Sequence, residues 1–207
     1  AHLSWRDSYP YNCISTLALH PIYINLEEVG TLNDKWAAAR FKEEQKELNK
    51  GEFMDYEAVW HSKMRYLSAI YEQEKENTFA EPGYYSFIKH NREWVLPYGV
   101  FSALRDNFHT ANFREWGEFS TFSWELVERL SSKKSPIYSK VHFYLFVQYH
   151  LHKQMVHAKE YAHKHGVALK GDIPIGISRD SVEAWQYPHL FNFTQQAGAP
   201  PDFFSAD

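Results

Sequence analysis

The sequence predicts a mostly helical α/β fold, and three observations lead to this class. Several stretches carry apolar residues at three- and four-residue spacings, which is typical of amphipathic helices. A long helical stretch ends at Gly166 and is followed by VALKGDIPIGIS (residues 167–178), which reads as a buried parallel strand. Such a strand needs neighbours for its backbone groups, so either a larger protein or another chain must supply the sheet.

The composition is that of an ordinary soluble protein that is rich in aromatic residues. The 207 residues suffice for one sizeable core, and 44% are hydrophobic while 23% are charged. Aromatic residues reach 17%, enough to fill a core or to stack on flat ligands such as sugar rings. A net charge of −4 without a long basic block argues against a nucleic-acid partner.

Cysteine content and apolar runs bear on the compartment. Cys13 is the single cysteine, so no internal disulfide can form and a reducing compartment is the simplest expectation. The start AHLSWRD does not read as a secretory signal, and no apolar stretch is long enough to cross a bilayer. We therefore expect a cytoplasmic protein with no membrane partner, and no motif predicts a cofactor.

In the first half of the chain, helices follow an irregular start. Residues 1–27 look irregular, with PIYINL (21–26) as a short strand or an extended edge. WAAARFKEEQKELNK (36–50) predicts a helix that Gly51 ends. Asp55 is a plausible N-cap for the next helix. The apolar stripe of that helix consists of Tyr56, Val59, Trp60, Met64, Leu67, Ile70 and Tyr71.

The second half predicts three further helices. One spans residues 85–108, where Pro97 should break or kink it, and a shorter one spans 123–130. The clearest helix starts at Ser135–Pro136 and ends at HKHG (163–166), with cations in its last turn before a glycine. Its VHFYLFV segment is apolar almost all round, so we expect it inside the core.

Five histidines in the second half of this long helix, residues 150–165, raise the question of a metal site. His150 and His157 share a face, and helical His pairs do bind metals. However, there is no HExxH motif and no neighbouring cysteine. Solvated or capping roles are therefore predicted, and no metal, for His150, His152, His157, His163 and His165.

Acidic residues flank the predicted strand. Asp180 and Glu183 have the spacing of a capping box, so Asp180 is a candidate N-cap. Asp180 also follows the carboxyl end of the strand, where α/β folds bind ligands, and the two readings are compatible. Asp172, near the start of the strand, is expected to be a structural hydrogen-bond acceptor.

Two loops near the ends of the chain combine aromatic residues with proline or acidic residues. DSYPYNCISTLALHPIY (7–23) places two tyrosines around Pro10, for which ordinary packing is the simpler interpretation. QQAGAPPDFFSAD (195–207) sets an acid beside two large rings, as a functional loop would.

Taken together, these motifs resemble the 4-alpha-glucanotransferases, the amylomaltase or disproportionating-enzyme family (glycoside hydrolase family 77). The resemblance is greatest to the plant cytosolic type and its bacterial relatives. The segments that carry it are SYPYNCISTLALHP, WVLPYGVFSALRD (94–106), GVALKGDIPIGISRDSVEAW (166–185) and GAPPDFFSA (198–206).

The resemblance implies a fragment of a (β/α)8 TIM barrel with a large α-helical insertion. Residues 1–27 would be a barrel loop segment, 28–134 the helical insertion, and 135–207 a long helix, the third barrel strand and the following active-site loop. It also implies transfer of α-1,4-glucan segments by a retaining double displacement, with the catalytic carboxylates outside this chain.

The resemblance further implies supporting roles for individual residues. Tyr11 would pack on sugar at the cleavage site, and Asp180 would lie at the substrate-facing rim. Asp202, Phe203 and Phe204 would belong to a loop over the acceptor side. His20 stands where compact amylomaltases usually have Asn. Structural or supporting roles fall to Asp172, Ser181 and Trp185.

Maltodextrin or another α-1,4-glucan is thus the expected partner, and a truncated barrel should self-associate through its exposed edges. A different interpretation is a non-catalytic helical domain that binds glucan or a protein partner. It rests on the aromatic-rich helical stretch from Tyr56 to Trp124.

Overall fold

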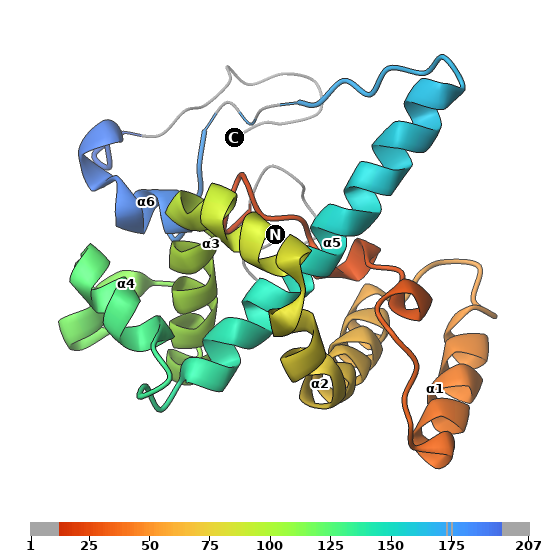
Figure 1. Ribbon diagram of the computed structural model, residues 1–207. Helices are drawn as coiled ribbons and strands as arrows, with labels where there is room; N and C mark the ends of the chain where they lie inside the picture. Colours follow the sequence, from red (N-terminus) through yellow and green to blue (C-terminus); the bar gives the residue numbers. More distant parts are fainter. Residues whose placement is uncertain (1–12, 173, 175, 196–207) are drawn as a thin grey trace.

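The computed structural model describes residues 13–172, 174 and 176–195, and this part of the chain is mostly helical (Figure 1). Short 3-10 turns and a small helix connect the longer helices. No β-strand occurs among the described residues. The α-helices are α1 (Lys35–Leu48), α2 (Tyr56–Ala80), α3 (Pro82–Phe108), α4 (Trp124–Ser131), α5 (Tyr138–Lys164) and α6 (Val182–Gln186); the 3-10 turns are η1 (Pro21–Tyr23), η2 (Leu26–Glu28), η3 (Phe113–Glu115), η4 (Gly117–Phe119) and η5 (Pro188–Leu190).

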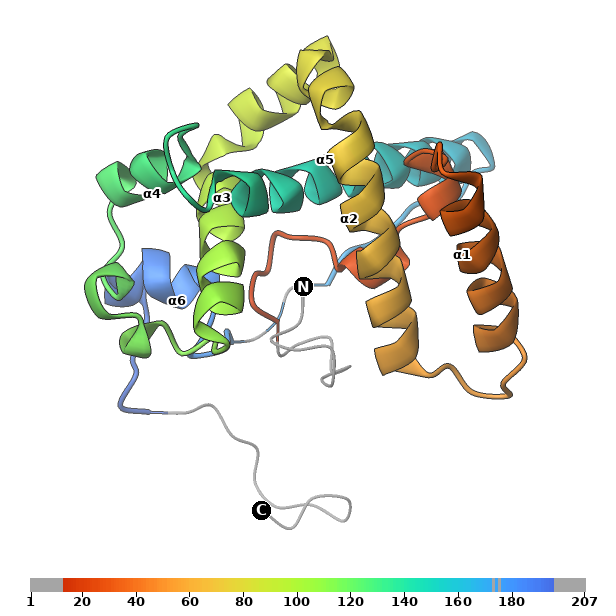
Figure 2. The same ribbon diagram turned by 90° about the horizontal axis from the view of Figure 1, so that it is seen from below.

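The pair formed by α3 and α5 organises the fold. The two helices cross, and α2 and α4 each contact both of them (Figures 1 and 2). A Cβ atom added at Gly99 of α3 would lie 3.0 Å from Leu145 Cδ2 and 3.2 Å from the carbonyl oxygen of Val141, both on α5. Glycine therefore permits the closest approach of the two helices.

Pro97 bends α3 without ending it, so the expected kink is confirmed (Figure 2). Proline has no N–H to donate to the carbonyl of Glu93, one turn earlier. That carbonyl instead accepts a hydrogen bond of 2.9 Å from Gln186 Nε2, at the end of α6. The bend in α3 is thus tied to the position of α6.

Two apolar clusters share α5. One packs α3, α4 and α6 against its first half, and the other packs α2 with η1 and η2. The predicted burial of the VHFYLFV segment is confirmed at Val141 and at residues 144–147.

Several helix ends match the local sequence signals, and one start is displaced. Asp34 and Asp55 accept backbone N–H groups at the starts of α1 and α2. Gly166, with φ of 75°, follows the end of α5, as expected. The predicted start at Ser135 is wrong, because its hydroxyl accepts from Ile137 N and forms a turn, and the helix begins at Tyr138.

Neither predicted extended segment is a strand among the described residues. Within 167–178 the described residues form no strand, because that part of the chain supplies no neighbouring strand for its backbone groups. Pro21–Tyr23 form η1 and Leu26 begins η2, because His20 Nδ1 and Asn25 Oδ1 each accept an N–H from two residues further on. Only Ile24 and Asn25, between the two turns, have an extended backbone. No described helix is long and apolar enough to cross a bilayer.

The five histidines between residues 150 and 165 divide into one buried and four exposed residues. His152, His157, His163 and His165 are exposed, and the described residues hold no group of three ligand-type side chains able to bind a metal. His150 is only 4% exposed, so the expected solvated role is wrong there. Neither ring nitrogen of His150 has a hydrogen-bond partner in the described part of the chain. Burial, followed by the nearby Lys153 charge, lowers the pKa of His150 to about 3.

This buried histidine predicts a loss of stability in acid. The unfolded chain protonates His150 below about pH 6.5, whereas the folded chain resists protonation down to about pH 3, so stability present above pH 6.5 is lost as the pH falls. His150→Phe should make the free energy of unfolding less dependent on pH between about 6.5 and 3, as measured by urea titrations across this range. His157→Phe, at an exposed position of the same helix, is the control. Equal slopes in the wild type and His150→Phe would contradict the expectation.

Candidate functional site

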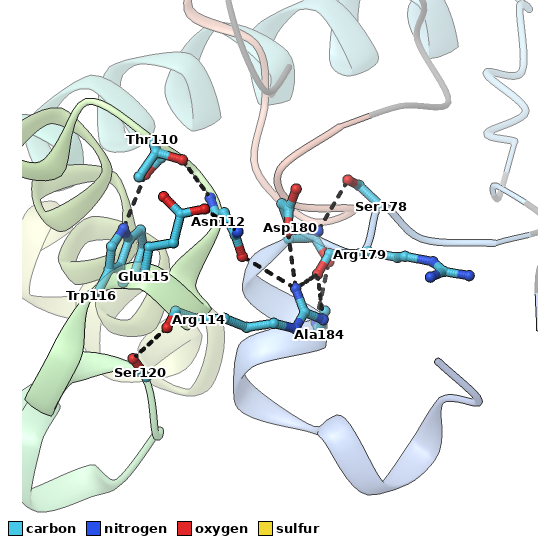
Figure 3. Close-up of polar contacts among 11 residues, drawn as sticks. Thr110, Asn112, Arg114, Glu115, Trp116, Ser120, Ser178, Arg179, Asp180 and Ala184 are labelled. Carbon is cyan, nitrogen blue, oxygen red and sulfur yellow. Dashed lines mark hydrogen bonds and ion pairs between the residues drawn. The ribbon is translucent and has the colours of Figure 1, made fainter. Parts of the chain in front are cut away.

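The loop before α6 and the segment around η3 form the candidate site (Figure 3). The loop contributes Ser178, Arg179 and Asp180, and the facing segment contributes Asn112 and Arg114. These five residues, joined by the contacts described below, are called the Asp180 cluster.

Ser181, not Asp180, is the N-cap of α6. The Ser181 hydroxyl accepts a hydrogen bond of 3.1 Å from Ala184 N, and the Ser181 side chain is fully buried. The capping role expected for Asp180 is therefore wrong, because the next residue already satisfies the first turn. The carboxylate of Asp180 is left to interact outside the helix.

Arg114 holds the carboxylate of Asp180. Its Nη1 donates to Asp180 Oδ1 at 3.1 Å, and both Nη1 and Nη2 lie 3.4 Å from the carbonyl oxygen of Arg179. Nη1 also lies 3.5 Å from Asn112 Oδ1. The side chain of Asp180 remains 37% exposed, and its Oδ2 has no hydrogen bond among the described residues. One carboxylate oxygen is thus engaged and the other is available to a ligand.

The backbone of the loop is held from both directions. Asp180 N donates to Ser178 Oγ at 3.3 Å, and Arg179 Nη2 donates to the carbonyl of Gln195 at 3.1 Å. Beneath the loop, Trp185 is 1% exposed, and its indole N–H donates to the carbonyl of Phe119 at 3.1 Å. The Trp185 ring meets that of Trp116 edge-on, with centroids 6.2 Å apart. This packing fixes α6 below the Asp180 cluster.

Glu183 joins α6 to the N-terminal motif. Its Oε1 accepts from Ser15 Oγ at 2.8 Å and from the backbone N and hydroxyl of Thr16 at 3.0 and 3.2 Å. The backbone N of Val182 donates to the carbonyl of Ile14 at 2.7 Å. Two motifs 168 residues apart in sequence therefore lie side by side.

The remaining predicted residues lie elsewhere. His20 is 6% exposed and packs against Trp60, with ring centroids 5.2 Å apart. Asp172 is exposed. The other predicted site residues lie outside the described part of the chain: Tyr11, Asp202, Phe203 and Phe204.

Sequence reasoning missed the roles of Arg114 and Glu183. Glu183 was assigned to a capping box, and its real partners precede it by more than 160 residues. Arg114 stands in no motif, and no local signal could have linked it to Asp180.

The whole chain matches a known enzyme family. Residues 1–207 match the model of the 4-alpha-glucanotransferases, glycoside hydrolase family 77, and the chain belongs to this family.

Individual relatives are consistent with this assignment. The chain is 39% identical over 208 residues to the 4-alpha-glucanotransferase DPE2 of Oryza sativa subsp. japonica, covering 98% of the chain and 21% of that protein. It is 28% identical over 203 residues to the 4-alpha-glucanotransferase of Chlamydia pneumoniae, covering 98% of the chain and 38% of that protein. The chain thus spans less than half the length of these relatives.

A solved structure shares the fold. It is the amylomaltase from Streptococcus agalactiae in complex with acarbose, with a TM-score of 0.75 and 24% sequence identity. The similarity covers 96% of this chain and 41% of the amylomaltase chain. The helical arrangement described above is therefore also found within a larger amylomaltase.

Removing the Glu183 carboxylate should loosen the N-terminal segment. Glu183→Ala takes away three hydrogen bonds to Ser15 and Thr16, and we expect the free energy of unfolding to fall by about 2 kcal/mol. Hydrogen exchange should accelerate at the Thr16 amide, while Glu183→Gln should retain part of the protection. Glu118→Ala, at a 71% exposed side chain, is the control. Unchanged exchange at Thr16 in Glu183→Ala would contradict this role.

Proposed function

We propose that this chain is part of a 4-alpha-glucanotransferase that transfers α-1,4-glucan segments between maltodextrin or glucan chains. Membership of the family and the names of the relatives support this activity. The observation that carries the proposal is the junction of residues 14–16 with the Asp180 loop and α6. It unites two of the four motifs on which the family resemblance depends.

In this proposal, Asp180 binds substrate and does not take part in bond cleavage. Its Oδ2 accepts a hydrogen bond from a sugar hydroxyl, while Oδ1 stays with Arg114. Tyr11 and the rings of Phe203 and Phe204 contact sugar faces, and Asp202 accompanies them, as the resemblance implies. Asp172, Ser181 and Trp185 support the loop.

The chain then corresponds to part of a TIM barrel. Residues 1–27 form a barrel loop segment, 28–134 a helical insertion, and 135–207 the segment around the third strand. Cleavage follows the retaining course, in which a carboxylate nucleophile forms a glycosyl-enzyme and a second carboxyl group acts as acid and then base. In this proposal both catalytic carboxylates lie outside this chain. The isolated chain self-associates through the exposed edges of its truncated barrel. We place the whole protein in the cytoplasm.

The isolated chain should therefore lack transferase activity. The whole protein that carries it should release glucose from maltotriose, and the 207-residue chain should release none above background. In the whole protein, Asp180→Ala should lower kcat/KM roughly tenfold, because one hydrogen bond to the substrate is lost. Glu43→Ala, at an exposed carboxylate on α1, is the control. Turnover by the isolated chain would contradict the placement of the catalytic carboxylates.

A second candidate function is a helical domain that binds glucan or a protein partner. A cleft of about 870 Å³ between α1, α2, η1 and η2 favours it. Its lining combines aromatic and amide side chains, including Phe41, Phe53, Tyr66, Gln45 and Asn49. Phe53 is 83% exposed, as is Trp36 on α1. Rings and amides together suit a sugar chain.

Titration of the isolated chain with maltoheptaose, followed by tryptophan fluorescence, separates the two candidates. A saturable signal that Phe53→Ala weakens and Tyr11→Ala leaves unchanged would favour the helical binding domain. A signal that depends on Tyr11 and not on Phe53 would assign glucan binding to the transferase site alone.

A further inference from the structure

We infer that Arg114 is a positioning residue for substrate binding: its guanidinium fixes the Asp180 carboxylate so that Oδ2 points to the substrate. This inference rests on the proposed function. It adds a residue from the helical part of the chain, which no motif singles out, to the site at the loop before α6 (Figure 3).

The shape of the guanidinium suits this task. Arg114 engages two acceptors on adjacent residues, Oδ1 of Asp180 at 3.1 Å and the carbonyl oxygen of Arg179 at 3.4 Å. A planar fork with several N–H groups can hold both, and this fixes the carboxylate relative to the loop backbone. A lysine ammonium is a single point of charge and cannot reproduce the pair of directions.

Arg114 is itself held by a rigid base. Its carbonyl oxygen accepts a hydrogen bond of 3.3 Å from Ser120 Oγ. Its guanidinium carbon lies 4.6 Å from the ring centroid of Phe113 and 5.4 Å from that of Phe193. Trp116, two residues along, is 1% exposed and donates its indole N–H to the carbonyl of Thr110 at 3.0 Å. The guanidinium therefore has few alternative positions.

The pair is poorly suited to a purely structural role. The side chains of Arg114 and Asp180 are 46% and 37% exposed, and ion pairs at such positions contribute little to folding stability. The helix start that Asp180 could have stabilised is already capped by Ser181. A change at Arg114 should consequently alter substrate binding while the thermal unfolding midpoint stays nearly constant.

The test is steady-state transfer by the whole protein with maltotriose. We expect Arg114→Lys to raise KM roughly tenfold and to change kcat less than about twofold, because a charge-assisted contact that positions bound substrate is lost. Arg92→Lys is a matched control. Arg92 Nη2 donates to Glu128 at 2.6 Å and its guanidinium lies over the Trp124 ring, in a pair on α3 and α4 whose side chains are 41% and 60% exposed. The KM of the Arg92→Lys variant should equal that of the wild type.

A double-mutant cycle shows whether Arg114 acts through Asp180. In an Asp180→Ala background, Arg114→Lys should have no further effect on KM. A wild-type KM in Arg114→Lys, or an equal effect with and without Asp180, would overturn the inference while the unchanged protein still transfers glucan. Absence of transfer by the unchanged protein would instead overturn the proposed function, and this inference with it.

Discussion

At Gly99 the backbones of α3 and α5 come so close that a single methyl group would lie 3.0 Å from Leu145. Glycine is a poor helix former, and its presence in mid-helix costs about 0.5–1 kcal/mol relative to alanine. The close crossing offsets that cost by letting Leu145, Val141 and their neighbours exclude water completely. Helices α2, α4 and α6 pack around this crossing, so their directions depend on it.

The candidate site depends on connections between segments that are distant in sequence. Glu183 ties the N-terminal motif to α6, and Arg114 ties the η3 region to the loop in front of α6. Each connection ends on a carboxylate, and each uses an oxygen that the sequence pattern had assigned to a helix cap. The Asp180 oxygen that Arg114 does not hold, Oδ2, is what remains for an interaction with a ligand.

The sequence was most informative where one residue determines local geometry. Asp55 and Gly166 act within one turn of a helix, so their roles could be predicted. The strand expected at 167–178 could not be judged locally, because a strand exists only through its neighbours. Ser181 and Asp180 are adjacent and both are good caps, so only geometry could decide between them. The Arg114 contact required the folded chain.

The bend of α3 at Pro97 couples the motion of this helix to that of α6. The carbonyl of Glu93 has its hydrogen bond only while Gln186 stays docked. Undocking of α6 would break this hydrogen bond, so the stability of α3 at its bend is coupled to the docking of α6. The loop that carries Asp180 and the midpoint of α3 should then open as one cooperative unit. Helix α3, which contributes no side chain to the site, in this way suppresses local fluctuations there.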